Sequence, residues 1–535
     1  IMVRARIRPL GVAVTWVASI GIERNWSCSK WVSCDDEEPS RSRTLERIAS
    51  KRLATRTEKL DVVFSRENLM RKNPRKFEEE YLVGETIGTG GFGSVLKCTN
   101  IFTKKEVAVK HLPGNSVADR EELDQELKAL ALVDHPNVVR LFEYFEDKHW
   151  FGSDFYLVFE LCTGPTLFDW LVEHFKQNGS VSEIDAARLL RQMIKAILCC
   201  HVHGVIHKDV KPENFIFLHK DDKSALKTID LGLSEFTTGH PRKRSGTLLY
   251  MAPEVLLERD YTDQCDMFSL GSICFLMLLG EPLITSDEAG KDGRGAVKIF
   301  SKKDAVEKVF QSCKRHGQLS RQAQDFLFKM LAWNPEDRLS PRAALHHPFI
   351  LAAYAERGDG FVPLGPALAP RAQQHVDEIR RYSSRPALVR FAHSMIVHYM
   401  DDEDVVETRN FFRACDEAGR GMLTCEELKA AVTACGVTWP KDMDSALASM
   451  DANHKGEITY EEFLSATLPQ SALTKQEYVL AAWHAFDPKR QGVISAADLQ
   501  VFFPAMSTKD RRRMLREVVE SAELTFEEFE VLVAS

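Results

Sequence analysis

The stretch from His207 to Asn214 brings together side chains that could act on a substrate. Asp209, Lys211 and Asn214 place a carboxylate, an ammonium group and an amide close together, directly after an apolar segment typical of a helix. Such groups can accept a proton, bind an anion and hold a metal ion, as a catalytic loop must. Taken alone, the Asp-x-Lys-Pro-x-Asn string also fits a surface turn, because proline and asparagine favour turns. The neighbouring motifs decide between these interpretations.

A glycine-rich segment from Ile87 to Val95 precedes this stretch and joins two strand-like runs. Glycines allow the backbone to close over phosphate groups, although a single G-x-G-x-x-G pattern also arises by chance. Here Val-Ala-Val-Lys, ending at Lys110, follows at the distance of the next strand pair. This second motif strengthens the interpretation of the glycines as part of a nucleotide-binding site.

Further motifs follow in a fixed order along the chain. Glu126 lies in a helix-like segment, and residues 156–162 read as a buried strand. Asp230 stands in Thr-Ile-Asp-Leu-Gly, and Glu254 closes a Gly-Thr-Leu-Leu-Tyr-Met-Ala-Pro-Glu segment. Arg338 is the expected buried partner of Glu254. A surface turn would not come with these accompanying motifs.

These ordered motifs resemble a eukaryotic Ser/Thr protein kinase domain over about half of the chain. The resemblance implies a bilobal fold and transfer of the γ-phosphate of ATP, with Mg2+, to protein hydroxyls. By that resemblance Asp209 accepts the hydroxyl proton, Lys211 steadies the phosphate and Asn214 holds a metal ion. The candidate magnesium ligands are Asn214 and Asp230.

The resemblance also assigns the ATP site. Lys110 would bind phosphates with Glu126 as its partner, and Val95 would pack against adenine. Glu160 and Cys162 would offer backbone hydrogen bonds to the base. The ATP-binding candidates are Ile87, Gly88, Gly90, Gly93, Val95, Ala108, Lys110, Glu126, Glu160 and Cys162.

Two positions depart from the kinase pattern. Lys208 replaces the arginine that receives an activation-segment phosphate, and lysine cannot make the bidentate contact. We therefore expect activity without phosphorylation of the activation segment. Thr166 stands where kinases that prefer basic substrates carry a glutamate, but Glu213 remains, which weakens rather than abolishes that preference.

Composition narrows the class of protein. The chain has 535 residues, 44% of them hydrophobic and 28% charged, which is typical of globular domains. Its net charge of −8 argues against nucleic acid as the main partner. The 12 cysteines follow no framework spacing and indicate reduced thiols in a cytoplasmic protein.

The first 80 residues combine a short basic and apolar segment with a basic arm. The apolar run from Leu10 to Ile22 is too short to span a bilayer comfortably, and no clear cleavage site follows it. Residues 40–76 are rich in Arg, Lys and Ser, as in a flexible arm or, alternatively, a contact for anionic lipid. Membrane association through this segment is compatible with the sequence but has no further support.

A linker from Gly358 to Pro370 leads into an amphipathic helical segment, Val376 to Met400, which Pro386 is expected to kink or divide. Arg380 and Arg381 precede two serines and look like a kinase substrate. The segment is interpreted as an autoinhibitory helix that plugs the substrate cleft, with the arginines meeting Glu213; an ordinary packing helix is the alternative.

An internal repeat follows. Asp416, Asp451 and Asp487 each begin a twelve-residue window with glycine at the sixth place and an apolar eighth residue. Three such windows in phase indicate an EF-hand array, in which oxygen ligands at set places bind calcium. A fourth repeat keeps only its end, with Ala522 where glycine belongs.

The calcium ligands are incomplete in every window. The second loop is the best candidate, although Lys455 stands at its fifth place; its residues are Asp451, Asn453, Lys455, Glu457, Thr459 and Glu462. The first loop is weak because Ala418 and Arg420 replace ligands, and the third because its twelfth residue is a short aspartate. The weak candidate ligands are Asp416, Thr424, Glu427, Asp487, Ser495 and Asp498.

A kinase joined through a basic helix to four EF-hands resembles the calcium-dependent protein kinases of plants and protists, over residues 80–535. The resemblance implies a calcium-regulated Ser/Thr kinase with ATP, Mg2+ and Ca2+ as cofactors and proteins as substrates. The alternatives are a constitutively active kinase with structural EF-hands and a non-catalytic pseudokinase scaffold. Phosphorylation assays with and without a chelator separate the three.

The expected fold is α+β: a bilobal kinase domain and then an all-α EF-hand domain. The expected divisions are an N-terminal extension (1–80), the kinase domain (81–350), a linker with the junction helix (351–400) and the EF-hand domain (401–535).

Overall fold

The computed structural model describes residues 69–90, 93–113, 120–149, 152–221, 224–232, 234–236, 246–290, 293–313, 316–356, 364–451 and 455–534. The predictions made for residues 1–68, for Asn453 and for part of the linker after Gly358 lie outside the described residues.

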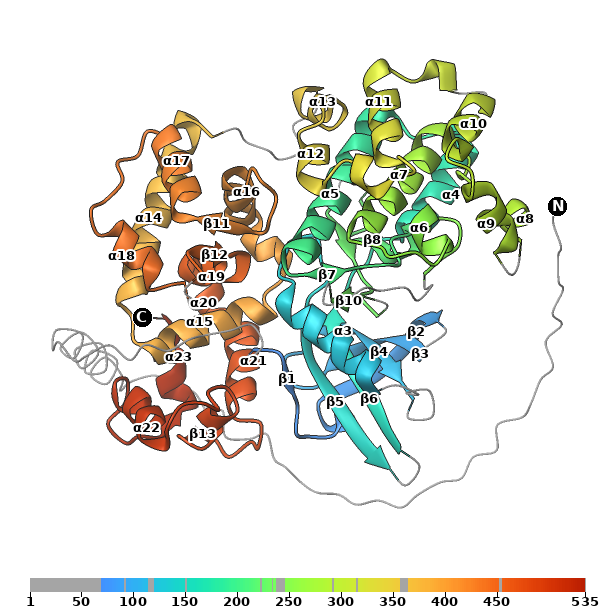
Figure 1. Ribbon diagram of the computed structural model, residues 1–535. Coiled ribbons are helices and arrows are strands. Elements are labelled where there is room, and N and C mark those ends of the chain that lie inside the picture. The colour runs from blue at the N-terminus through green and yellow to red at the C-terminus, as the bar shows by residue number, and fades with distance from the viewer. Residues whose placement is uncertain are drawn as a thin grey trace. The chain divides into compact units, whose positions relative to one another are not determined.

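The first lobe is a six-stranded sheet with one long helix, α3 (Arg120–Leu132) (Figure 1). The sheet order is β1-β5-β6-β4-β3-β2. The strands are β1 (Arg71–Lys72), β2 (Tyr81–Gly90), β3 (Gly93–Asn100), β4 (Glu106–Leu112), β5 (Leu141–His149) and β6 (Gly152–Glu160). Side chains alternate between the two faces of a strand, so the buried Val107 and Val109 leave Ala108 and Lys110 on the opposite face of β4.

The second lobe is mainly helical. Of its two central helices, α7 (Gln264–Leu279) is apolar nearly all round and almost completely buried, whereas α5 (Glu183–Val202) buries an apolar face and keeps charged residues on the other. Between them run β7 (Val205–Ile206), β8 (Phe215–Phe217), β9 (Leu226–Thr228) and β10 (Glu235–Phe236). The other helices are α4 (Leu167–Asn178), α6 (Pro253–Leu256), α8 (Ser286–Ala289), α9 (Arg294–Phe300), α10 (Ala305–Ser312), α11 (Arg321–Met330), α12 (Pro341–Leu345) and α13 (Pro348–Glu356).

The predicted junction helix forms two helices, α14 (Ala369–Ser384) and α15 (Ala387–Tyr399), divided at Pro386. Proline has no N–H to donate and clashes with the preceding turn, so the helix ends before it and a new one begins after it. Helix α14 begins at Ala369, so the predicted helix start at Val376 is too late. Ala369 and Pro370 therefore belong to a helix rather than to the predicted linker.

Four EF-hands follow as two pairs. In the first pair, α16 (Val406–Cys415) and α17 (Cys425–Ala434) are joined by a ladder of β11 (Met422–Thr424) with β12 (Glu457–Thr459) to α18 (Met443–Ala448) and α19 (Tyr460–Ala466). The second pair has the ladder of β13 (Val493–Ile494) with β14 (Leu524–Thr525). Its helices are α20 (Gln470–Leu473), α21 (Gln476–Phe486), α22 (Thr508–Arg516) and α23 (Phe526–Ala534).

One hydrophobic core unites the sheet with the EF-hand region. Phe77, Phe142 and Phe145 of the first lobe belong to the same buried cluster as Phe391 of α15 and Phe486 of α21. A separate cluster fills the helical lobe, and a third lies between α3 and the sheet. None of the helices in the described part of the chain is both long and apolar enough to cross a membrane.

The fourth repeat keeps the turn geometry of the other three. Gly421, Gly456 and Gly492 have φ values of +74°, +77° and +79°, and Ala522 has φ +60°. A Cβ atom makes this left-handed conformation costly, so Ala522→Gly is expected to stabilise the protein by about 1 kcal/mol. Chemical denaturation of both proteins in a chelator measures the difference. An unchanged or lower free energy of unfolding would contradict the expectation.

Candidate functional site

The cleft between the lobes brings the predicted ATP-site lysine together with two carboxylates. Lys110 Nζ lies 2.6 Å from Glu126 Oε1 and 3.6 Å from Asp230 Oδ1. Burial alone would lower the pKa of Lys110, but Glu126 and Asp230 raise it above its ordinary value. The lysine is therefore positively charged in the cleft. This closed ion pair is the arrangement that a protein kinase needs for phosphoryl transfer.

The glycine-rich segment and the end of β6 frame the same cleft. Gly88 pairs with Val95 and Gly90 with Gly93 across the β2–β3 hairpin. A Cβ atom at Gly93 would lie 2.0 Å from the carbonyl oxygen of His111, so only glycine fits this close approach. Ile87 is 46% exposed at the end of β2 and presents an apolar side chain to an incoming molecule.

The strand β6 ends at Glu160, whose backbone N–H donates to the carbonyl of Arg140. Its own carbonyl and the backbone of Cys162 are the polar groups that this segment can offer to a base. Burial raises the pKa of the Cys162 thiol, so this side chain is neutral. Residues 160–162 therefore offer a half-buried backbone to a base, and the Cys162 side chain adds no charge there.

The predicted catalytic residues form one hydrogen-bonded group. Lys211 Nζ donates to Asp209 Oδ2, and Thr247 Oγ1 donates to Asp209 Oδ1 at 2.8 Å. Asn214 Nδ2 donates to the carbonyl oxygen of Asp209 at 2.8 Å and to its carboxylate at 3.1 Å. Burial alone would raise the pKa of Asp209, but the hydrogen bonds from Lys211 and Thr247 hold it below its ordinary value. The carboxylate is therefore charged at neutral pH.

A buried aspartate holds the catalytic loop in place. Asp266, in the first turn of α7, accepts hydrogen bonds from the backbone N–H groups of His207 and Lys208, both at 2.9 Å. These bonds hold Lys208 in a left-handed conformation with φ +68°. In the same lobe, Arg338 binds both carboxylate oxygens of Glu254 at 2.6 Å. The Asp266 bonds position the catalytic loop, and the Arg338–Glu254 pair fixes the start of α6, both without touching the reacting groups.

Sequence reasoning missed the partner of Lys208. Its Nζ lies 2.6 Å from Glu235 Oε2, and the hydroxyl of Tyr261 donates to the same oxygen at 3.0 Å. The exchange of arginine for lysine could have pointed to an acidic partner nearby, but several acidic residues follow in the sequence and none stands out. Glu235 belongs to β10, which pairs with β7 directly before the catalytic loop.

The residues present fit ATP with magnesium. The Asp230 side chain is 39% exposed, and its Oδ1 accepts the N–H of Gly232 at 2.9 Å. The amide nitrogen of Asn214 is engaged with Asp209, so its amide oxygen is the atom left for a metal ion. Oxygen atoms of this kind are the ligands that Mg2+ prefers.

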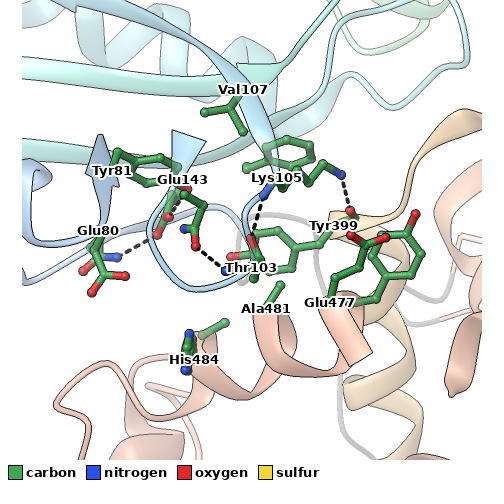
Figure 2. A pocket seen from close by; sticks show the side chains of 15 residues that line it. Glu80, Tyr81, Thr103, Lys105, Val107, Glu143, Tyr399, Glu477, Ala481 and His484 are labelled. Atoms are coloured by element: carbon green, nitrogen blue, oxygen red, sulfur yellow. Dashed lines mark hydrogen bonds between the residues drawn. The ribbon is translucent and has the colours of Figure 1, made fainter. Parts of the chain in front are cut away.

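The EF-hand region contacts the rear of the cleft through α15. Arg140, which precedes β5, donates to the carbonyl oxygens of Val397 at 2.8 Å and Met400 at 3.1 Å. Lys105 Nζ donates to the carbonyl of Tyr399 at 2.5 Å, in a pocket lined by the first lobe and α21 (Figure 2). These bonds satisfy the carbonyl groups at the end of α15, which have no partner within the helix.

A second missed residue, Lys227, links this contact to the ATP site. Its Nζ lies 2.8 Å from Glu160 Oε1 at the end of β6 and 3.0 Å from Asp402 Oδ2 at the start of the EF-hand region. The Lys227 side chain is 2% exposed. Burial alone would lower the pKa of Lys227, but Asp402 and Glu160 raise it. The three groups form a buried ion-paired network.

The junction helices do not lie in the substrate cleft of this structure. Arg380 pairs with Asp442 at 2.9 Å, and Arg381 bonds within its own helix to the carbonyl of Asp377. The predicted contact of these arginines with Glu213 is therefore wrong for this arrangement. The physical reason is that Ile379 and Phe391 bury their apolar side chains in the EF-hand core instead.

The three calcium loops differ in how well they fit the ion. In the second loop, the Asp451 carboxylate accepts the backbone N–H groups of Lys455 and Gly456, and Glu462 accepts the N–H of Thr459. Both ends of this loop thus keep carboxylates facing backbone amides, although Asn453 lies outside the described residues.

The first and third loops fit calcium less well. Arg420, at the fifth place of the first loop, bonds to Glu427 at the twelfth place. In the third loop, the Asp498 carboxylate is held by the N–H and hydroxyl of Ser495 at 2.9 and 2.6 Å. Within the described ranges, no three His, Cys, Asp or Glu side chains are grouped so that they could hold a metal ion.

Two family models match the chain. The protein kinase domain matches residues 81–350, and the EF-hand domain pair matches residues 407–468. The chain is thus a protein kinase with a following EF-hand region.

Curated relatives align over most of the chain. Calcium-dependent protein kinase 7 of Oryza sativa subsp. japonica is 32% identical over 444 residues, which cover 81% of this chain and 76% of the relative. Calcium-dependent protein kinase 34 of Arabidopsis thaliana is 30% identical over 84% of both chains. Calcium-dependent protein kinase 3 of Plasmodium berghei (strain Anka) is 29% identical over 82% of this chain and 75% of the relative.

The chain belongs to the calcium-dependent protein kinase family. It is an ATP-dependent Ser/Thr protein kinase, and the predicted α+β fold, with a kinase domain followed by helical EF-hands, is confirmed. These matches do not favour the pseudokinase scaffold or the kinase with merely structural EF-hands.

Proposed function

We propose that this kinase phosphorylates protein Ser/Thr hydroxyls through Asp209 and that calcium at its EF-hands controls the activity. The observation that carries the first part is the group formed by Asp209, Lys211, Thr247 and Asn214. It holds a charged carboxylate in one orientation, ready to accept the proton of a substrate hydroxyl.

The other cleft residues bind and orient ATP. Lys110, fixed by Glu126, neutralises phosphate charge, and Lys211 steadies the transferring group. Asp230 and Asn214 would hold magnesium, which supplies charge stabilisation of the phosphates when bound. Ile87, Val95 and Ala108 would enclose the adenine, and the glycines at 88, 90 and 93 allow the backbone to approach the phosphates.

Identification of the phosphorylated amino acid tests this activity. The purified full chain with labelled ATP, magnesium and a mixed protein substrate is expected to yield phosphoserine or phosphothreonine. Phosphotyrosine as the main product, or no transfer with or without calcium, would refute the proposed reaction.

The Lys208–Glu235 pair supports activity without phosphorylation of the activation segment. Glu235 provides the negative charge that a phosphate supplies elsewhere, and it lies 2.6 Å from the lysine. We expect Glu235→Gln to lower kcat by roughly three- to tenfold, the range of a partly exposed ion pair. Steady-state assays beside the exposed Glu258→Gln control measure this.

Phosphatase treatment gives the complementary check. Treated wild-type enzyme is expected to keep its activity. If the treatment silenced the enzyme, and only rephosphorylation at Thr237, Thr238 or Ser245 restored it, the charge-pair account would be wrong.

Substrates with basic residues near the target hydroxyl are the preferred class. Glu213 lies next to the catalytic group, and its Oε2 is buried without a hydrogen-bond partner among the described residues. A buried carboxylate oxygen in this state favours a cationic partner. Thr166 instead caps α4 by accepting the N–H of Asp169, which leaves one acidic contact fewer than in strongly basophilic kinases.

Calcium control is supported by the second loop and by the junction helices. In the arrangement described, α14 and α15 pack in the core of the EF-hand region, and Arg380 pairs with Asp442 rather than with Glu213, which fits an activated state. In the calcium-free state the same segment would return toward the substrate site. Calcium opens sensor EF-hands and exposes a groove for an amphipathic helix, so binding shifts the population between these states.

A cytoplasmic location fits the chemistry of the thiols. None of the ten cysteines in the described part of the chain forms a disulfide, and most are buried. Reduced thiols of this kind are typical of a reducing compartment. A fluorescent fusion of the full chain that concentrates at membranes would instead favour a membrane contact through the N-terminal segment.

A further inference from the structure

The first EF-hand loop contains a positive side chain at the place where calcium ligands normally converge. Arg420 stands at the fifth place of the loop that begins at Asp416. Its Nη2 lies 2.6 Å from Glu427 Oε2, the twelfth-place carboxylate. In a calcium-loaded hand this glutamate is the bidentate ligand. The guanidinium thus binds the group that would otherwise bind the metal.

The same guanidinium also reaches the second loop. Arg420 Nη1 bonds to the carboxylate of Glu457, the seventh residue of that loop. Glu457 pairs with Thr424 in the β11–β12 ladder, so the side-chain contact and the ladder join the same two strands. One arginine therefore connects both loops of the first EF-hand pair.

The first-place carboxylate of this loop accepts two backbone N–H groups, as it does in the second loop. Asp416 accepts the N–H groups of Arg420 and Gly421, both at 2.9 Å, and Asp451 accepts those of Lys455 and Gly456. The start of the first loop therefore has the same geometry as the second, and the feature that argues against calcium is the guanidinium at its end.

The loop lies in a contact with little access to water. It packs against the kinase, where a Cβ at Gly419 would lie 3.0 Å from Lys195 Cγ, and both Lys195 and Arg420 are buried. A divalent cation added to this loop would meet the guanidinium of Arg420 in a low-dielectric contact, which is unfavourable.

We propose that Arg420 is a built-in cation of the first EF-hand, which takes the place of calcium and holds the first EF-hand pair together without metal. The first loop is then a constant docking element of the kinase, and any calcium response arises in the other loops. This inference deepens the proposed calcium control, but it makes a claim about metal stoichiometry that does not depend on activity.

The second loop provides a comparison for the first. It has Lys455 at its fifth place, where the first loop has Arg420, and its twelfth-place Glu462 accepts the N–H of Thr459 at 2.8 Å. The two loops therefore allow the same substitution to be made at the same place.

Native mass spectrometry of the full chain with calcium chloride counts the bound ions. Glu427→Gln is expected to leave the number of bound calcium ions unchanged, because the first loop holds none. Glu462→Gln, the same substitution at the same place of the second loop, is the matched control for a metal-binding loop. Loss of one bound calcium in Glu427→Gln would overturn the proposal, whatever the activity of the enzyme.

Thermal unfolding in a chelator tests the structural role independently. Arg420→Gln is expected to lower the unfolding temperature by several degrees, because Glu427 and Glu457 then face each other without a cation. The exposed Arg512→Gln serves as the control and should change little. Equal unfolding temperatures for Arg420→Gln and wild type would contradict the built-in cation, and failure of the variant to fold leaves the calcium count of Glu427→Gln as the deciding measurement.

Discussion

Replacement of Asp209 by asparagine is expected to lower kcat by about 10³-fold, within the range for loss of a positioned general base. Asparagine keeps the size of the side chain, and its single amide oxygen can still accept one of the two hydrogen bonds that Lys211 and Thr247 donate to different oxygens of Asp209. It cannot take the proton of the substrate hydroxyl at neutral pH. The loss should therefore fall on kcat, while the KM for ATP changes little because Lys110 and Asp230 are untouched.

Initial-rate kinetics of the purified Asp209→Asn protein measure this loss. The exposed Asp287→Asn substitution on α8 is the matched control and should retain full activity. The thermal unfolding profile of Asp209→Asn should resemble that of wild type. Near-normal turnover in a correctly folded Asp209→Asn protein would remove Asp209 from the proposed chemistry.

Lys227→Met is expected to destabilise the protein by about 3–5 kcal/mol, the usual cost of removing one partner from a buried ion pair. The substitution leaves Glu160 and Asp402 close together without their shared cation. Arg409, 3.0 Å from Asp402, and Arg140, which attracts both carboxylates, compensate part of this negative charge. Because Asp402 begins the EF-hand region, we also expect this region to detach more readily from the kinase.

Chemical denaturation measures the loss of stability, and limited proteolysis reports release of the EF-hand region. Lys220→Met removes an exposed lysine from the same lobe and is the matched control. Wild-type stability of Lys227→Met would show that the network contributes nothing to the contact between the two regions.

The kinase part could be predicted from local motifs because each functional residue is tied to its own short element. Lys110 follows from strand alternation in β4, and Asp209 and Asn214 lie on one short loop. Glu126 required only the choice of one glutamate on one helix. The ordered motifs then determined which elements must face each other.

The remaining contacts depend on side chains that meet across long distances in the sequence. Lys227 joins Glu160 and Asp402. Glu160 lies 67 residues before Lys227 in the chain, and Asp402 lies far after it. No local pattern distinguishes this buried lysine from an exposed one. Burial in a strand, together with two carboxylates from separate elements, becomes visible only in the fold.

The position of the junction helices illustrates another limit. An amphipathic helix with two arginines fits both an acidic cleft and an apolar groove. The sequence does not show which of these two binding places has the lower free energy. In the structure Tyr382 and Phe391 are buried, and Arg380 pairs with Asp442. The apolar face thus selects the EF-hand core in this state.

The EF-hand loops show the same contrast on a smaller scale. Glycine at the sixth place predicts the left-handed turn, and Gly421, Gly456 and Gly492 adopt it. The sequence also marks Arg420 as a poor calcium ligand. It does not show that the guanidinium bonds to Glu427 and Glu457, because that depends on the reach of a flexible side chain.

Phosphate transfer by the full chain in calcium and in chelator tests the central claim most directly. The assay follows transfer from ATP to a serine peptide with basic flanking residues. The account predicts a severalfold higher rate in calcium than in chelator, a weaker response in Glu462→Gln, and almost no transfer by Asp209→Asn in either condition. Equal wild-type rates in calcium and in chelator would contradict calcium control, and transfer that survives in Asp209→Asn would contradict the assigned catalytic site.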